Sequence, residues 1–485
     1  MKRSPAHKAE GTAAPALRPA PAADDPDAEG LAFQEPFEDE FEEEDIVEGD
    51  ADMAGEDDAG EEAEEERQPQ VAYYRPEPGQ PGEEMEHDPT AYGMLHRMRF
   101  AWPALSFDFL VDQLGQNRTR YPASCFLVAG TQAEKAGDNA VNVIRLAQLG
   151  RTKVSDAMDD DAIEDEPEEE VDPTCEHRSL PHTGSVNRIR AMKQRPSLVA
   201  TWAETGLVHV YDLAKPLSTL GYPCDSAGAW SVSTLSGHKA EGYALDWSPA
   251  HVGRLATGDC ASGIIVWDAS VNAKESLKFT GHNGSVEDLQ WSPNEANVFA
   301  SCSCDGTVRI WDTRSTKPGG MLTERAHDQD VNVISWNAKV EHLLASASDD
   351  ASFKVWDLRM FGKAQPVGWF HGFHQGPICS IEWSPHDESV LVCASEDHQV
   401  SIWDLALEED REFARAGGMA EDVVDASGRS VVFPPQLLFV HAGIADPKEA
   451  RFHPQVVGLV GVTGEEGFDV FVCESLDPLS KALEG

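Results

Sequence analysis

Basic residues, long apolar runs and paired cysteines are all scarce in this sequence of 485 residues. Lysine and arginine total 38 against 86 aspartates and glutamates, a formal net charge of -48. So acidic a surface repels phosphate backbones, and we expect no direct binding to nucleic acid. No run approaches the roughly 18 consecutive apolar residues that span a bilayer, so no membrane contact is expected. The nine cysteines form no CxxC pair, which argues against a disulfide framework.

Signatures of enzymes are missing as well. The chain contains no P-loop, no HExxH, no GxSxG and no cluster of cysteine and histidine with metal-ligand spacing. We therefore expect a non-enzymatic protein with no catalytic residues, no cofactor and no bound metal.

The negative charge is concentrated in two segments. Residues 1–90 hold 29 acids and 6 bases, and residues 156–176 hold 12 acids and no base, which leaves a net charge of -13 on the other 374 residues. Repulsion and a shortage of apolar groups predict a disordered acidic tail over residues 1–87 and a solvated acidic insert over residues 156–176. Both could serve only solubility; the hypothesis we favour is that they hold a strongly basic protein.

A repeat dominates the rest of the chain. In five copies a histidine stands 29 positions before an aromatic residue that is followed by aspartate, and a sixth, weaker copy runs from His441 to Phe471. The five histidines are His182, His238, His282, His327 and His374. The core period of about 45 residues is that of the WD40 repeat, in which each copy forms one four-stranded blade of a propeller.

The region before the first clear copy predicts a seventh blade. Residues 124–130 and 141–149 and the strand around 178–180 are β-rich, and residues 105–111 alternate as a strand expected to close the ring against the C-terminal blade. The expected fold is an all-β, seven-bladed WD40 propeller over residues 102–485. The acidic insert interrupts it, and a long loop spans residues 405–433.

Polar residues recur inside the repeat at fixed positions. A small hydroxyl often stands ten residues before the aromatic, and an aspartate six before it. These residues resemble the WD40 structural tetrad, whose members satisfy one another's hydrogen bonds. Two sets are complete: His282, Ser301, Asp305, Trp311, and His327, Ser346, Asp350, Trp356. Two others look degraded, because Cys393 replaces the hydroxyl before Trp403 and Ala261 replaces the aspartate before Trp267.

The segment before the propeller is expected to be a short helix over residues 88–101. Asp88 can cap it and Pro89 suits its first turn, and apolar residues follow at helical spacing. The helix either docks on the propeller or lines a groove that receives a partner helix.

A family resemblance enters on three motifs. YGMLHRMRFAWPALSFDFLV (residues 92–111), HTGSVNRIR (182–190) and PPQLLF (434–439) resemble segments of the histone-binding WD40 proteins of the retinoblastoma-binding type. Together with the acidic tail and insert, they resemble the glutamate-rich WD-repeat branch. Members of that branch act in ribosome biogenesis as dedicated chaperones of a large-subunit ribosomal protein, number three in the standard naming.

The resemblance implies a non-enzymatic chaperone that escorts a basic ribosomal protein to pre-60S particles. It would act in the nucleus and nucleolus, with some protein in the cytoplasm, and we expect a monomer. The alternatives are a histone-binding chromatin scaffold and a substrate adaptor of a ubiquitin ligase. Histone recognition is weakened because GRSVVF (428–433) stands before the prolines, where the histone binders carry acids.

Two sets of binding residues are expected. By the resemblance, a side groove would be lined by Tyr92, Leu95, Met98, Phe100, Pro434 and Pro435. One rim of the ring, where propellers often bind peptides, would carry residues that directly follow repeat histidines: Asn283, Asp328 and Gln375.

Overall fold

The computed structural model describes residues 88–152, 172–220, 231–268, 274–315, 320–363, 365–407, 423–424, 430–431, 433–465 and 467–478. The acidic tail predicted over residues 1–87 lies outside this part of the chain, as do most of the acidic insert and most of the loop at 405–433.

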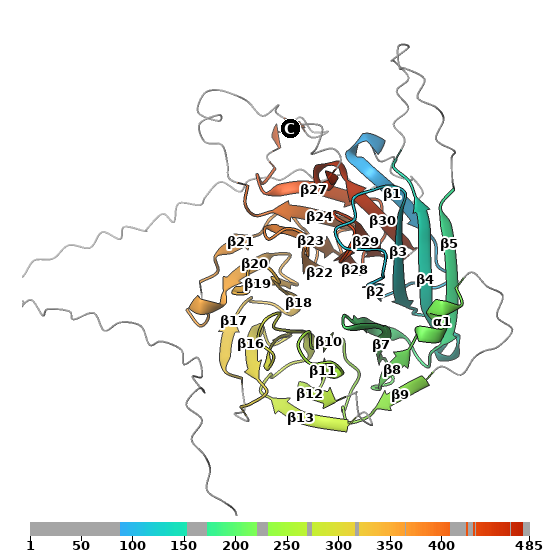
Figure 1. Ribbon diagram of the computed structural model, residues 1–485. Helices are drawn as coiled ribbons and strands as arrows, with labels where there is room; N and C mark the ends of the chain where they lie inside the picture. Colours follow the sequence, from blue (N-terminus) through green and yellow to red (C-terminus); the bar gives the residue numbers. More distant parts are fainter. Residues whose placement is uncertain are drawn as a thin grey trace, which may run out of the picture. The chain divides into compact units, whose positions relative to one another are not determined.

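The described residues form seven four-stranded antiparallel sheets arranged around a ring (Figure 1). The prediction of a seven-bladed propeller is confirmed. From the innermost strand outward, blades 1 to 3 consist of β2 (Ser106–Leu110), β3 (Ala123–Gly130), β4 (Ala140–Leu149), β5 (Thr174–Pro181); β6 (Val186–Met192), β7 (Arg195–Ala203), β8 (Val208–Asp212), β9 (Ser231–Leu235); and β10 (Leu245–Trp247), β11 (Arg254–Gly258), β12 (Gly263–Asp268), β13 (Lys274–Thr280).

Blades 4 to 6 follow the same order, and blade 7 joins the two ends of the described chain. The strands are β14 (Val286–Trp291), β15 (Val298–Ser303), β16 (Thr307–Asp312), β17 (Leu322–Arg325); β18 (Val331–Trp336), β19 (Leu343–Ser348), β20 (Phe353–Asp357), β21 (Gly368–Phe370); β22 (Ile378–Trp383), β23 (Val390–Ser395), β24 (Gln399–Asp404), β27 (Leu437–Ala442); and β28 (Glu449–Phe452), β29 (Val460–Thr463), β30 (Phe468–Cys473), β1 (Tyr92–Met98).

Helical structure is minor among the described residues. It comprises the five-residue helix α1 (Ala214–Ser218) and four 3-10 turns of three residues each. The turns are η1 (Pro89–Ala91), η2 (Ala136–Asp138), η3 (Leu358–Met360) and η4 (Glu474–Leu476). A separate two-stranded pair is formed by β25 (Val423–Val424) and β26 (Ser430–Val431).

The helix predicted over residues 88–101 is wrong. Asp88 does accept hydrogen bonds from the backbone and side chain of Thr90, at 2.9 and 2.6 Å, but the helical turn that follows is only η1. Strand β1 then pairs with β30, with Leu95 opposite Phe471 and Met98 opposite Phe468. Pairing with a strand at the other end of the chain thus overrides the helical spacing of the apolar residues.

The strand that closes the ring is also not the predicted one. We expected residues 105–111 to complete the C-terminal blade, but β2 is the innermost strand of blade 1 and pairs with β3. The outermost strand of blade 7 is β1. The first and last parts of the described chain therefore share one sheet, which leaves no unpaired end in the ring.

Side chains connect the seven innermost strands in sequence around the channel. Each link joins a blade to the next by a hydrogen bond of 2.6–3.2 Å that involves one side chain and one backbone group. In order from blade 1, the pairs are Asp108–Ala191, Trp247–Arg190, Asp246–Trp291, Asp288–Ile334, Ser335–Trp383, Glu382–Phe452 and Glu449–Phe107. This belt satisfies buried polar groups where the blades converge.

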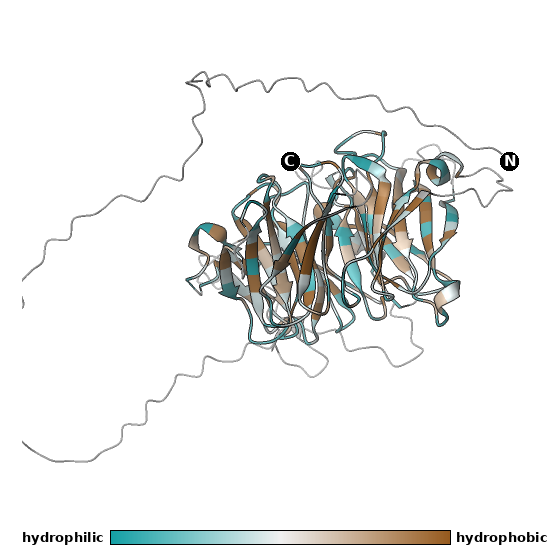
Figure 2. Cartoon of the chain, turned by 90° about the horizontal axis from the view of Figure 1, so that it is seen from below, coloured by the Kyte–Doolittle hydropathy of each residue, from teal (hydrophilic) through white to brown (hydrophobic). Residues whose placement is uncertain are grey.

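Apolar side chains fill the spaces between adjacent blades. Trp267, Trp311 and Trp403 are almost completely buried, and each belongs to a core cluster with strands of a neighbouring blade. Figure 2 shows the hydrophobic residues concentrated on the strands and hydrophilic residues on many of the connecting loops. Large aromatics of this kind contribute much of the burial that stabilises a propeller.

Candidate functional site

The repeat histidines define one face of the ring, which we call the His face. In blade 4, His282 Nδ1 lies 3.1 Å from Asp305 Oδ2 and Nε2 lies 2.7 Å from Ser301 Oγ, to which Trp311 Nε1 donates at 2.8 Å. Asp305 also accepts from the backbone N–H of Asn283. The tetrad therefore holds the turn that carries the predicted rim residue Asn283.

Blade 5 repeats this geometry with His327, Ser346, Asp350 and Trp356. His327 contacts Asp350 Oδ2 and Ser346 Oγ, each at 2.9 Å, and Trp356 Nε1 donates to the same hydroxyl. Burial alone would raise the pKa of Asp350, but hydrogen bonds from His327 and Ser352 outweigh it and lower the pKa to about 2.

The tetrad of blade 6 is complete although its expected hydroxyl is missing. Ser401 takes the place of Cys393: its Oγ lies 2.7 Å from His374 Nε2 and accepts from Trp403 Nε1 at 2.7 Å. Cys393 and Ser401 are directly paired across β23 and β24. A hydroxyl on either strand can therefore reach the same histidine.

The tetrad of blade 3 is likewise repaired. Asp259, two residues before Ala261, contacts His238 Nδ1 at 2.9 Å, and Thr257 Oγ1 lies 2.6 Å from His238 Nε2. The prediction that these two tetrads are degraded is therefore wrong.

Carboxylates follow the mouth of the channel on the His face. We call this set the acidic rim; its members are Glu204, Glu241, Glu287, Asp330, Asp349 and Glu396. Adjacent members share neighbours: burial and then hydrogen bonds to Asp330 and Glu287 raise the pKa of the Cys304 thiol. Glu241 and Glu287 likewise contribute, after burial, to the raised pKa of Cys260.

The sequence analysis missed the acidic rim because its members stand at different repeat positions. The three predicted rim residues, Asn283, Asp328 and Gln375, are exposed on turns of the same face. The Asp328 side chain is 99% exposed. The rim and these turns together form a surface suited to cationic peptides.

Four of the six residues predicted to line a side groove serve blade packing instead. Tyr92 is only 5% exposed, and its hydroxyl lies 2.9 Å from His441 Nδ1. Leu95 packs against the core between blades 6 and 7, and Met98 and Phe100 pack against the core between blades 7 and 1. These four belong to β1 or directly follow it, so the expected helical wall is not formed by them.

The double proline lies on the neighbouring blade. Pro434 is half-buried and accepts a hydrogen bond from Leu437 N–H at the start of β27, and Pro435 is exposed. Phe439 of β27 meets the Tyr92 ring edge-on at 5.1 Å. The turn and β1 thus occupy adjoining outer strands of blades 6 and 7.

The described residues that flank the two acidic segments meet at the junction of blades 7 and 1. The tail precedes Asp88, five residues before Gly93, whose carbonyl accepts from Thr152 N–H at 3.0 Å. Thr152 is the last described residue before the insert, and Thr174, just after it, pairs with Ala147 of β4. Both segments therefore join the propeller at one place.

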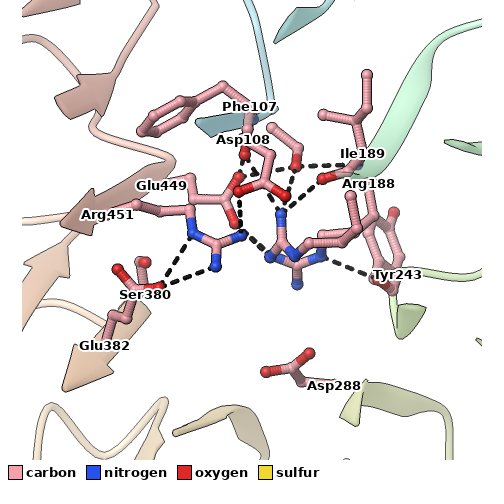
Figure 3. Close-up of polar contacts among 12 residues, drawn as sticks. Phe107, Asp108, Arg188, Ile189, Tyr243, Asp288, Ser380, Glu382, Glu449 and Arg451 are labelled. Atoms are coloured by element: carbon pink, nitrogen blue, oxygen red, sulfur yellow. Dashed lines mark hydrogen bonds and ion pairs between the residues drawn. The ribbon is translucent and has the colours of Figure 1, made fainter. Parts of the chain in front are cut away.

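Charged residues also converge at the centre of the ring (Figure 3). We call this group the arginine cluster; it consists of Arg188, Arg190, Arg451, Glu449, Glu382 and Asp108. Glu449 Oε1 lies 3.2 Å from Arg188 Nη1 and 2.5 Å from Arg190 Nη2. Arg451 contacts Asp108 at 3.2 Å and Glu382 at 2.8 Å.

The cluster determines the ionisation of its central carboxylate. Burial alone would raise the pKa of Glu449, but Arg190, Arg188 and Arg451 outweigh burial and hold the pKa at about 2. Carboxylates act in the same way on Arg451: burial would lower its pKa, and Asp108, Glu382 and Glu449 raise it. The cluster is therefore fully charged at neutral pH.

The described part of the chain lacks two further kinds of feature. None of its groups of histidine, cysteine, aspartate and glutamate could hold a metal ion. None of its helices is long and apolar enough to cross a membrane.

Comparison with protein families agrees with the blade geometry. The family described as "WD domain, G-beta repeat" matches residues 273–312, 320–357 and 365–404. A second family, that of the histone-binding protein RBBP4 and its counterpart in the CAF1 complex, matches residues 82–149, which include β1 to β4.

Three similar proteins cover most of the chain. Glutamate-rich WD repeat-containing protein 1 of Dictyostelium discoideum is 43% identical over 81% of this chain and 83% of its own length. Ribosome assembly protein rrb1 of Schizosaccharomyces pombe is 40% identical over 93% of this chain and 94% of its own. Protein HEAT STRESS TOLERANT DWD 1 of Arabidopsis thaliana is 41% identical over 81% and 88%.

Proposed function

The chain belongs to the family of the glutamate-rich WD repeat-containing proteins, and from this premise we propose that it is a non-enzymatic chaperone in ribosome biogenesis. Its client is a basic large-subunit ribosomal protein, number three in the standard naming, which it escorts to pre-60S particles in the nucleolus. The name of the Schizosaccharomyces pombe relative, a ribosome assembly protein, supports this role.

One observation carries the proposal: two acidic segments join the propeller at the junction of blades 7 and 1. By sequence, residues 1–90 contribute a net charge of -23 and residues 156–176 a net charge of -12. Since Thr152 bonds directly to Gly93, both segments can act on the same client. Complementary charge raises the rate of encounter and suppresses association with partners of the wrong sign.

The propeller offers a second acidic element. The acidic rim lies on the His face, where turns held by buried tetrads present Asn283 and Gln375. A basic client held by the tail and the insert could dock there. Many weak charge contacts would then replace the rRNA phosphates that a basic protein otherwise binds.

The test compares the full chain with a neutral variant in which every Asp and Glu in residues 24–87 and 156–172 becomes Asn or Gln. The variant keeps the chain length and leaves β5, which starts at Thr174, unchanged. A full-length chain with the same acidic residues in scrambled order is the matched control, because charge and composition are retained.

The measurement is the dissociation constant for the purified ribosomal protein at several salt concentrations. Exposed charge pairs contribute up to about 1 kcal/mol each, so losing many should weaken binding at least roughly tenfold and flatten its salt dependence. The scrambled control should bind like the natural chain. Equal affinity of the neutral variant at low salt would overturn the capture role.

A histone-binding scaffold is the second candidate function. It is favoured by the match of residues 82–149 to a family described as histone-binding. Affinity purification followed by mass spectrometry separates the two: ribosomal protein and pre-60S factors support the chaperone, and histones without them support the scaffold.

A further inference from the structure

A cavity of about 440 Å³ occupies the channel at the face opposite the His face, where the innermost strands end. All seven innermost strands, or the residues directly after them, contribute to its wall. The turns that follow Trp247, Trp291 and Trp383 bring their prolines to its edge. The cavity is thus built by the whole ring.

The wall formed by blades 6, 7, 1 and 2 is internally neutralised. It carries the arginine cluster, in which Arg188 and Arg190 pair with Glu449, and Arg451 pairs with Glu382 and Asp108. Three guanidinium groups thus face three carboxylates. Figure 3 shows these groups turned toward one another. A ligand would have to break ion pairs to bind this wall, which is costly for buried charges.

The wall formed by blades 3 to 5 differs in sign. It presents two carboxylates, Asp246 and Asp288, together with the neutral Gln290 and Ser335. Neither carboxylate forms an ion pair with any residue that the structure describes. Asp288 is only 5% exposed and lies apart from the cluster in Figure 3, with no contact drawn to an arginine.

The polar contacts of these two carboxylates leave room for a donor. Asp246 Oδ2 accepts from Trp291 N–H at 2.8 Å. Asp288 accepts from Leu289 N–H at 2.9 Å and from Ile334 N–H at 3.2 Å. Two carboxylates offer about eight lone-pair positions in total, so backbone groups use only part of the acceptor capacity.

We infer that this cavity is a binding site for a single lysine or arginine side chain presented by a protein partner, with Asp246 and Asp288 as the carboxylates that hold the cation. The inference rests on the proposed function in one respect, namely that the basic client supplies the side chain. A buried carboxylate without a cation is costly, and an inserted cation removes that cost.

The ionisation of the two carboxylates supports the inference. Burial raises the pKa of Asp246 to about 6, despite the opposing effects of Lys193, the Trp291 N–H group and Arg190, and Asp288 adds to the rise. Burial also raises the pKa of Asp288, against Arg188 and Arg190. A cation that favours the charged form should therefore bind more weakly as the pH falls from about 7 to about 5, by roughly tenfold if Asp246 dominates.

The test uses a fluorescent Gly/Ser peptide with one central arginine, and its analogues with lysine, citrulline or glutamate at that position. Anisotropy is measured against the full chain and the variant Asp246→Asn/Asp288→Asn. Asparagine keeps an oxygen that can accept from Trp291 N–H and Ile334 N–H, so the belt of hydrogen bonds is retained. Equal thermal unfolding midpoints verify the fold, and Asp328→Asn, on the exposed His face, is the matched control.

The arginine and lysine peptides should bind the full chain and the Asp328→Asn control equally well, and the double variant at least roughly tenfold more weakly. The citrulline and glutamate peptides should bind none of them measurably. Unchanged binding to the double variant, or equal binding of citrulline, would overturn the inference. Either failure leaves the proposed function standing, because capture by the acidic segments is tested separately with the neutral variant.

Discussion

Replacing Glu449 by glutamine should weaken the closure of the ring. Glu449 lies on β28 of blade 7, accepts from Phe107 N–H of blade 1 and pairs with Arg188 and Arg190 of blade 2. Glutamine keeps an oxygen for the hydrogen bond but removes the charge. Two buried guanidinium groups then lose their shared counterion.

Two independent estimates of the loss agree. Removing one partner of a buried ion pair costs about 3–5 kcal/mol. Lowering the pKa of Glu449 from 4.5 to about 2 corresponds to about 3 kcal/mol in favour of the folded, ionised form. Since its side chain is only 3% exposed, solvent screening reduces this value little. We expect Glu449→Gln to lower the free energy of unfolding by about 3 kcal/mol.

The pH dependence gives the same carboxylate a second signature. Because the folded pKa is lower than the ordinary value, the contribution is present above about pH 4.5 and disappears as the pH falls toward about 2. The natural chain should therefore lose more stability across this range than Glu449→Gln. Urea unfolding followed by tryptophan fluorescence measures both effects, and Glu465→Gln, an exposed position on the same blade, is the control. A loss below about 1 kcal/mol at neutral pH would refute the role given to the ion pairs.

Three further substitutions test the packing assignments by the same unfolding assay. Ser401→Ala should cost about 1–3 kcal/mol by leaving its two partners unsatisfied, whereas the exposed Ser218→Ala should change little; equal effects would contradict the repaired tetrad of blade 6. Asp259→Ala should cost a similar amount and Ala261→Asp should restore nothing, and the reverse pattern would return the blade 3 role to position 261. Tyr92→Ala should cost about 3 kcal/mol because β1 loses a buried aromatic, and a neutral effect would revive Tyr92 as a groove residue.

The blades could be predicted because their signal is local. A histidine and an aromatic 29 residues apart belong to one sheet, so the spacing survives wherever the blade sits in the ring. The tetrads of blades 4 and 5 follow the same local rule. Ser401 escaped the rule because it faces Cys393 across two strands, and a cross-strand pair is not visible as a fixed spacing.

The closure of the ring could not be predicted from local pattern. Strand β1 pairs with β30, nearly the whole described chain away, and its apolar residues follow a spacing that also suits a helix. The arginine cluster has the same origin: its six members come from blades 1, 2, 6 and 7. No single repeat contains its pattern, so only the assembled ring reveals the charged centre and the cavity beside it.

The most direct test of capture by the two acidic segments is carbodiimide cross-linking of the full chain to the ribosomal protein, which joins client lysines to nearby carboxylates. Mass spectrometry should then find the cross-links concentrated in residues 24–87 and 156–176, with others on the acidic rim. Cross-links confined to the outer strands of blades 3 to 5, with none in the two acidic segments, would contradict the account.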